Sequence, residues 1–167
     1  YAFDRPAELE TGYMFMGRTS KAGLIPMTKR TMYMFLVTSE GDDPKIPEKH
    51  LVPRFKEWLK EYEVSIVKDC IKKINDPKLV VYRPLETLFM AAPWYTNRVL
   101  IIGDAAHATI PQLGQGAGLA LEDSIVLAEL IQQDNPLEVT FEKYMKRRYD
   151  RCKMAVEAST QIGELEQ

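Results

Sequence analysis

Methionines and aromatic residues alternate in short segments near the start of the chain, a pattern typical of β-strands. Successive side chains of a strand point to opposite faces, and residues 12–19 and 31–38 fit this period, with a shorter strand predicted between them at 22–27. In the two longer segments both sets of side chains are apolar, so we expect both faces to be covered. Pro26 in the middle segment favours a sheet edge or a bulge. Together the segments predict an antiparallel meander.

The methionine and aromatic stripes of this meander have two interpretations. One is ordinary core, since methionine fills irregular gaps between other apolar side chains. The other is the wall of a pocket for an apolar substrate. Spacing alone favours the core.

The middle of the chain predicts two amphipathic helices followed by two strands. A polar loop over residues 39–49 leads into the first helix, whose first turn would hold Pro53. The second helix is expected to end at an Asn-Asp-Pro sequence. The predicted bounds are 48–62 and 64–74 for the helices, and 79–83 and 87–92 for the strands.

The last part of the chain has a different pattern. Residues 98–102 (RVLII) form a short apolar run without alternation, which is typical of a strand buried on both faces in a parallel sheet. After a glycine-rich loop, apolar residues recur at helical spacing over 119–133. A last helix, initiated by Pro136, is expected to extend to residue 164.

These patterns divide the chain into two parts. Residues 1–92 carry antiparallel strands and two helices, and residues 93–167 carry one buried strand, a loop and two helices. The expected fold class is therefore α+β followed by part of an α/β domain. A lone parallel-type strand cannot cover its own faces. Because the sequence also opens on Tyr1 rather than on Met, we expect a fragment whose remaining strands lie in an earlier part of the chain.

Composition and charge narrow the possible functions. The chain has 167 residues, of which 46% are hydrophobic and 28% charged, as in ordinary globular proteins. A formal net charge of −2 gives no reason to expect a nucleic-acid partner. The basic residues between positions 143 and 153 are interleaved with acidic ones and are interpreted as a solvated helix face. No apolar run approaches the roughly 20 residues that span a bilayer.

The two cysteines, Cys70 and Cys152, lie far apart in a chain without a visible signal peptide. We expect two free thiols in a reducing cytoplasm. With only two histidines and no C-x-x-C pattern, a metal site is not expected.

The stretch VLIIGDAAHATIPQLGQGAGLALED carries the candidate chemistry. An apolar run ends in Gly-Asp, and after a spacer three glycines follow at every second position. A dinucleotide fingerprint needs its glycines directly after the strand, where the tight turn delivers the pyrophosphate to a helix N-terminus. A P-loop needs Gly-Lys-Ser/Thr. The sequence has neither arrangement here, so both explanations of the loop are excluded.

Three features of this loop together favour a cofactor site. Asp104 follows the carboxyl end of the predicted strand, where ligands bind in open α/β sheets, and its carboxylate can accept two hydroxyl hydrogen bonds, as from a sugar or ribityl chain. The glycines remove Cβ atoms where a flat ring would press on the backbone. The following helix offers unpaired N–H groups and a positive dipole end.

The sequence GDAAHATIPQLGQGAGLALEDS resembles the second FAD-binding motif of the flavoprotein aromatic hydroxylases, the single-component monooxygenases similar to salicylate hydroxylase and para-hydroxybenzoate hydroxylase. The antiparallel segment before it resembles that family's substrate domain. The resemblance implies FAD as cofactor, NAD(P)H and O₂ as co-substrates, and hydroxylation of a small aromatic or related ring. Residues 1–92 would be a substrate-binding portion, and residues 93–167 the C-terminal part of a Rossmann-like FAD domain.

The resemblance also assigns roles within the loop. Asp104 would bind the ribityl hydroxyls, with Gly103 allowing the turn. Residues 111–116 would lie along the flavin edge, and the Gly118 and Leu119 amides would face the pyrimidine end of the ring, where reduced flavin carries negative charge. No residue of this chain is expected to be catalytic. The expected cofactor-binding residues are Gly103, Asp104, Pro111, Leu113, Gly114, Gln115, Gly116, Ala117, Gly118 and Leu119.

Three polar residues near the motif have structural interpretations. His107 could be a general base, but no nucleophile elbow or triad order supports that role, and a loop histidine that holds the turn is favoured. Glu122 and Asp123 are interpreted as acids of the first helical turns that complement the helix dipole.

The strand–GxGxxG–helix that holds the ADP half of FAD in this family is absent from the sequence. We therefore expect these residues alone to bind FAD weakly or not at all. Two alternatives stay open: a flavoprotein of the same superfamily with other chemistry, such as a prenyl-lipid reductase or a halogenase, and a non-catalytic remnant that acts as an interaction module. The oligomeric state is also open, with a homodimer as one option.

Overall fold

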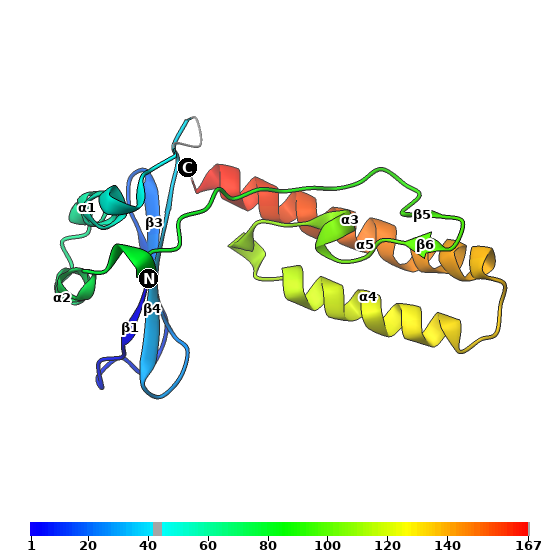
Figure 1. Ribbon diagram of the computed structural model, residues 1–167, viewed down its shortest axis with the longest axis horizontal. Helices are drawn as coiled ribbons and strands as arrows, with labels where there is room; N and C mark the ends of the chain where they lie inside the picture. Colours follow the sequence, from blue (N-terminus) through cyan, green and yellow to red (C-terminus); the bar gives the residue numbers. More distant parts are fainter. Residues whose placement is uncertain (42–44, 167) are drawn as a thin grey trace. The chain divides into compact units, whose positions relative to one another are not determined.

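The computed structural model describes residues 1–41 and 45–166, which form two compact units, Tyr1–Pro84 and Leu85–Leu165. Figure 1 shows the elements of each unit along the chain. The division falls after Pro84 rather than after residue 92, because residues 88 and 90 bond to the backbone of the second unit. Each unit has its own core and is described by itself.

Four antiparallel strands form the sheet of the first unit, in the order β1 (Ala2–Asp4), β4 (Thr31–Thr38), β3 (Ser20–Pro26) and β2 (Tyr13–Met16). The predicted meander is confirmed, and β1 adds a strand that the sequence pattern did not indicate. Pro26 ends β3 beyond the residues that pair with β2, so its missing N–H interrupts no ladder on that side.

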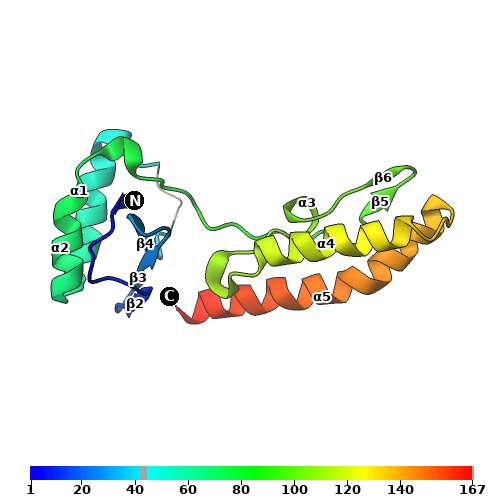
Figure 2. The ribbon, with the colours of Figure 1, turned by 90° about the horizontal axis from the view of Figure 1, so that it is seen from below.

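Helices supply the rest of this unit's core (Figure 2). α1 (Glu48–Trp58), η1 (Leu59–Glu61) and α2 (Ser65–Lys73) agree with the predicted segments, although Pro53 lies inside α1 rather than in its first turn. Residues 42–44 of the predicted polar loop lie outside the described residues. The buried side chains of this segment include Phe55, Leu59, Val67, Cys70 and Ile74.

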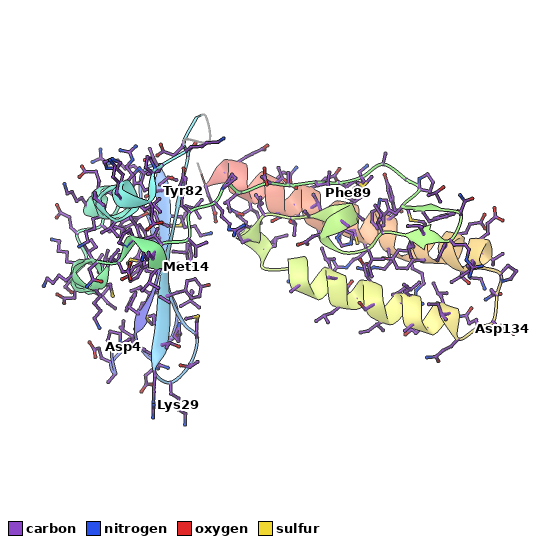
Figure 3. The ribbon with its side chains drawn as sticks, in the orientation of Figure 1. Asp4, Met14, Lys29, Tyr82, Phe89 and Asp134 are labelled. Carbon is purple, nitrogen blue, oxygen red and sulfur yellow. The ribbon has the colours of Figure 1, made fainter. Side chains whose placement is uncertain are left out.

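Only one face of the sheet is buried. Leu24, Met32 and Met34 are fully buried against the helices. On the opposite face Met14, labelled in Figure 3, is 58% exposed, and the ring of Phe35 lies over Gly23, where a Cβ atom would clash with it. The prediction that both faces are covered is therefore wrong for the described residues: one stripe is core and the other is open.

The predicted strand at 79–83 is absent. η2 (Pro77–Leu79) follows α2 instead, and the chain then continues without strand pairing. Alternation does persist, since Val81 is 74% exposed between half-buried neighbours. A strand also needs a backbone partner with matching N–H and C=O groups. The alternation of side chains along a sequence does not show whether such a partner exists.

The second unit is built on two long helices. α4 (Gly116–Ile131) and α5 (Leu137–Leu165) lie side by side as an antiparallel pair (Figure 2). Their connection contains Asp134, labelled in Figure 3, with a left-handed φ of 53°. α5 matches its prediction closely, whereas α4 starts before the predicted residue 119 and ends before residue 133.

α4 is apolar on two sides. Leu119, Val126 and Leu130 are buried in the core of the unit. Leu121 and Ile125, on the other side, are 66% and 59% exposed. The helix therefore fits neither a simple amphipathic pattern nor full burial within the described residues.

Within the apolar run at 98–102 only a short strand is found, and the parallel pairing predicted for it, with strands outside this sequence, is not confirmed. β6 (Val99–Leu100) pairs antiparallel with β5 (Tyr95–Thr96) in a two-residue hairpin, and Val99 is 61% exposed. No parallel pair occurs among the described residues. An unbroken apolar run indicates a demand for burial, but the direction of pairing depends on a partner elsewhere in the fold. The described fold is thus mixed α and β with antiparallel sheets.

Residues 87–92 are extended but are not a strand. The N–H groups of Leu88 and Met90 donate to the carbonyls of Ala108 and Ala106, both at 2.9 Å. Both cysteines are buried free thiols, as predicted. None of the helices in the described residues combines the length and the apolar character needed to cross a membrane.

Candidate functional site

The Gly-Asp pair forms a sharp turn between β6 and a short helix. Gly103 has φ 60° and ψ −143°, a region that is essentially open only to glycine. Directly after it, α3 (Asp104–His107) begins. The Asp104 side chain is exposed, and no described residue forms a hydrogen bond or ion pair with its carboxylate. The turn therefore presents two uncommitted carboxylate oxygens.

The second group of glycines opens α4. η3 (Pro111–Leu113) ends at Gly114, which has a left-handed φ of 61° and no atom within 4 Å of where its Cβ would lie. Gly116 is the first residue of α4. At Gly118 a Cβ would meet only a side-chain oxygen of Gln115, at 4.0 Å. Because the first N–H groups of a helix lack intrahelical acceptors, the backbone here offers open donors that no side chain covers.

Leu119 differs from the role that the resemblance implies. Its N–H donates to the Gln115 carbonyl at 2.9 Å, and its side chain is fully buried. The helix starts earlier than predicted, so the open donors belong to residues 116–118 and Leu119 is a core residue. Among the other predicted residues, Pro111, Gln115 and Ala117 are exposed and Leu113 is half-buried.

Helix α5 holds the loop between the two glycine groups. The Ser159 hydroxyl donates to the Ile110 carbonyl at 2.7 Å. Gly163 allows the close approach, since a Cβ there would lie 2.6 Å from the Ile110 side chain. The position of η3 is therefore set by α5 as well as by its own turns.

A buried carboxylate on α4 joins three segments of the unit. Asp123 is fully buried. Its Oδ2 accepts from the Gly103 N–H at 2.8 Å and bonds to His107 Nε2 at 2.7 Å. Its Oδ1 accepts from Arg148 Nε at 2.7 Å. Sequence reasoning missed this function, because Asp123 was interpreted as a complement to the helix dipole.

Arg148 corrects the interpretation of the basic segment. It is 4% exposed rather than solvated. Besides Asp123 it donates to Glu122 Oε2 at 2.6 Å and to the Leu119 carbonyl at 3.2 Å. Arg151 adds a contact to Glu122 at 3.2 Å. Glu122 therefore serves as an ion-pair partner of α5 more than as a partner of the helix dipole.

The environment fixes the charges of this network. Burial alone would raise the pKa of Asp123, but hydrogen bonds from His107, Gly103 and Arg148 lower it to about 2. Burial alone would lower the pKa of His107, but the bond to Asp123 and the nearby Cys152 raise it to about 9. The carboxylate is thus charged, and the imidazole is protonated at neutral pH.

His107 is therefore a structural cation. Its side chain is 1% exposed, and its ring lies 5.3 Å from that of Trp94 between ring centroids. Phe89, labelled in Figure 3, extends this cluster at 5.7 Å from Trp94. A buried ring that already carries its proton cannot serve as a general base for a bound substrate. The geometry agrees with the loop histidine that holds the turn.

Three possible metal ligands, His107, Asp123 and Cys152, have their ligand atoms within 4.8 Å of one another. Arg148 already bonds to two of them. Its Nε lies 2.7 Å from Asp123 and its Nη2 lies 3.5 Å from the Cys152 sulfur. A metal cation there would adjoin the buried guanidinium of Arg148. The arrangement suits the arginine rather than a metal ion.

Comparison with known proteins gives consistent results. A family model described as "FAD binding domain" matches residues 3–159. YetM of Bacillus subtilis, provisionally named an FAD-dependent monooxygenase, is 32% identical over 151 residues, which are 90% of this chain and 40% of that protein. The 2-heptyl-3-hydroxy-4(1H)-quinolone synthase of Pseudomonas aeruginosa is 34% identical over 116 residues, 68% of this chain and 30% of that protein.

A solved structure shares the fold. HpxO of Klebsiella pneumoniae, complexed with FAD and uric acid, superposes with a TM-score of 0.84 at 21% identity, over 96% of this chain and 41% of that chain. The chain thus spans less than half the length of each of these relatives. Since the family model covers nearly the whole chain, which carries the motif with its open donors and its free carboxylate, the chain belongs to the FAD binding domain family.

Proposed function

We propose that this chain is part of an FAD-dependent monooxygenase that hydroxylates a small aromatic or related ring with NAD(P)H and O₂. The observation that carries the proposal is that one motif combines the uncommitted Asp104 carboxylate with the uncovered donors of residues 116–118. The relatives that the chain resembles include a quinolone synthase and a protein complexed with FAD and uric acid. Both names point to planar heterocycles, which supports a ring as substrate.

The residues present fit the ribityl and ring portions of FAD. The two Asp104 oxygens can accept hydrogen bonds from neighbouring ribityl hydroxyls. Gly114 and Gly118 leave room for a flat ring to approach the backbone. Gly103 would allow the turn that presents Asp104, and residues 111–116 would lie along the flavin edge. Ala117 and Gly118 would offer N–H groups to the ring, and Leu119 contributes only through the core. The chain would then form the C-terminal part of a Rossmann-like FAD domain.

When bound, FAD supplies the hydride acceptance and the oxygen activation that amino-acid side chains lack. The chain's own residues would bind and orient FAD and polarise its ring. The amides of residues 116–118 and the positive end of α4 would stabilise negative charge at the ring edge. His107 is assigned no proton transfer to the substrate, because its ring is buried and its Nε2 is bonded to Asp123.

The open face of the first unit's sheet is the candidate wall of the ring pocket. It carries Met14, Met16, Tyr33 and Phe35, while the alternate residues form the core. Apolar and aromatic side chains suit contact with a planar ring. Of the two interpretations of the methionine and aromatic stripes, the pocket wall is thus proposed for the open face and the core for the other.

The test uses the full-length protein, prepared without its flavin. Titration with FAD, followed by the quenching of flavin fluorescence, should show tight binding. D104A should raise the dissociation constant of FAD about tenfold or more, since hydrogen bonds to a charged group are lost. The matched control is D150A, which removes an exposed carboxylate from α5.

Activity is then measured as ring-dependent oxidation of NAD(P)H with uptake of O₂. Absence of FAD binding by the wild-type protein would contradict the proposal. So would equal affinities of D104A and D150A for FAD, since the assigned ribityl contact would then contribute nothing.

A further inference from the structure

A single buried carboxylate connects the two parts of the proposed flavin site. Asp123 belongs to α4, whose N-terminal amides would face the ring. Its Oδ2 accepts the N–H of Gly103, the residue directly before the proposed ribityl ligand Asp104. One side chain of the ring-facing helix therefore holds the backbone of the ribityl-facing turn.

The turn needs such an anchor. The φ and ψ of Gly103 lie in a sparsely populated region, which persists only where the surroundings over-determine it. The carbonyl of Gly103 is fixed by the N–H groups of Ala106 and His107, both at 2.9 Å. The only described acceptor for its own N–H is Asp123. Without that bond the peptide unit between residues 102 and 103, which carries this N–H, would lose the contact that orients it.

The anchor is itself fixed from two further directions. Arg148 on α5 bonds to Asp123 at 2.7 Å and to the Leu119 carbonyl at 3.2 Å, so it fixes the carboxylate and the first turns of α4 together. His107 on α3 bonds to the same carboxylate oxygen as Gly103. Three donors on one buried carboxylate leave it little freedom to rotate.

We propose that Asp123 is a positioning residue for FAD, which sets the Gly103–Asp104 turn in its binding geometry against the N-terminus of α4 before the cofactor arrives. The inference rests on the proposed function for the identity of the ligand. Arg148 and His107 act through Asp123 and do not touch the cofactor.

The test compares D123N with E122Q in the full-length protein. D123N keeps the shape of the side chain but offers one acceptor oxygen to three donors. E122Q removes a carboxylate from the same helix and from the same arginine, yet touches no atom of Gly103. We expect the dissociation constant of FAD to rise about tenfold or more in D123N and to stay within about twofold in E122Q.

A spectroscopic readout separates positioning from general loss of structure. At saturating FAD, the visible circular dichroism of the bound flavin reports the surroundings of the ring. It should change in D123N and match the wild type in E122Q. A folded D123N protein with wild-type affinity and spectrum would overturn the inference. A wild-type protein that binds no FAD would overturn the proposed function, and the inference with it.

A second measurement needs no variant, because D123N leaves buried charges without their partner and its folding is not assured. Amide hydrogen exchange of the unaltered protein without FAD should show Gly103 protected to the level of Leu119, whose N–H lies in α4. Fast exchange at Gly103 that slows only when FAD is added would overturn the inference, since the turn would then be set by the cofactor.

Discussion

Alanine at Gly103 and alanine at Gly118 should change the stability of the protein in opposite directions. At Gly103 the backbone has φ 60° and ψ −143°, which costs a residue with a Cβ about 1–3 kcal/mol. The new Cβ would lie 3.4 Å from that of Ala120, which is close to ordinary contact, so the cost comes from the backbone conformation.

At Gly118 the backbone is helical and the space is open. A Cβ there would meet only Gln115 Oε1, at 4.0 Å. Alanine in place of glycine within a helix is favourable by about 0.5–1 kcal/mol. The two variants should therefore differ in free energy of unfolding by about 1.5–4 kcal/mol, with G103A the less stable.

Urea unfolding of the flavin-free full-length protein, followed by tryptophan fluorescence, measures this difference. FAD titration of the same samples separates stability from binding, because both variants should bind FAD more weakly although G118A is the more stable protein. A G103A protein as stable as the wild type would refute the assigned backbone conformation. A G118A protein with unchanged FAD affinity would refute the close approach of the ring.

Two further outcomes are expected. The pKa of His107 is raised from 6.5 to about 9, so protonated His107 contributes about 3 kcal/mol to the free energy of unfolding. This contribution is complete below pH 6.5 and is lost as pH rises through about 9. The free energy of unfolding of H107Q should therefore lack this fall between pH ~6 and ~10, and a fall equal to that of the wild type would exclude His107 as its source. F35A should raise KM for the ring substrate several-fold with little loss of stability, because Phe35 is only half-buried; unchanged kinetics across a panel of ring compounds would remove this sheet face from the proposed pocket.

Local patterns predicted the regular elements of the chain well. The alternation over residues 31–38 coincides with β4, and the helical spacing after residue 64 coincides with α2. These two predictions were right because every second side chain of the strand, or one side of the helix, is buried in the core of the same unit, as at Met32 and Met34. At residues 98–102 the unbroken apolar run predicted burial on both faces, but Val99 is 61% exposed among the described residues, and β6 pairs antiparallel with β5.

The roles assigned to the glycine loop remain predictions, and its supports were not predicted at all. The order and spacing of Gly103, Asp104 and the later glycines favoured a cofactor site, and the roles of these residues came from the family resemblance. Asp123 and Arg148 lie on different helices and meet only after these pack. One signal was available: Asp123 occupies a position on the buried side of α4, in series with Leu119, Val126 and Leu130. A lone acid among apolar positions indicates a buried partner.

The three-way anchor around Asp123 also bears on how this region can vary between related sequences. Loss of one member leaves the others buried with unbalanced charge, at a cost of about 3–5 kcal/mol, whereas simultaneous replacement of His107, Asp123 and Arg148 by apolar residues leaves no such imbalance. Positions 107, 123 and 148 should therefore change together or not at all. Substitutions at these sites are expected to be strongly epistatic, so the effect of a change at one position depends on which residues occupy the other two.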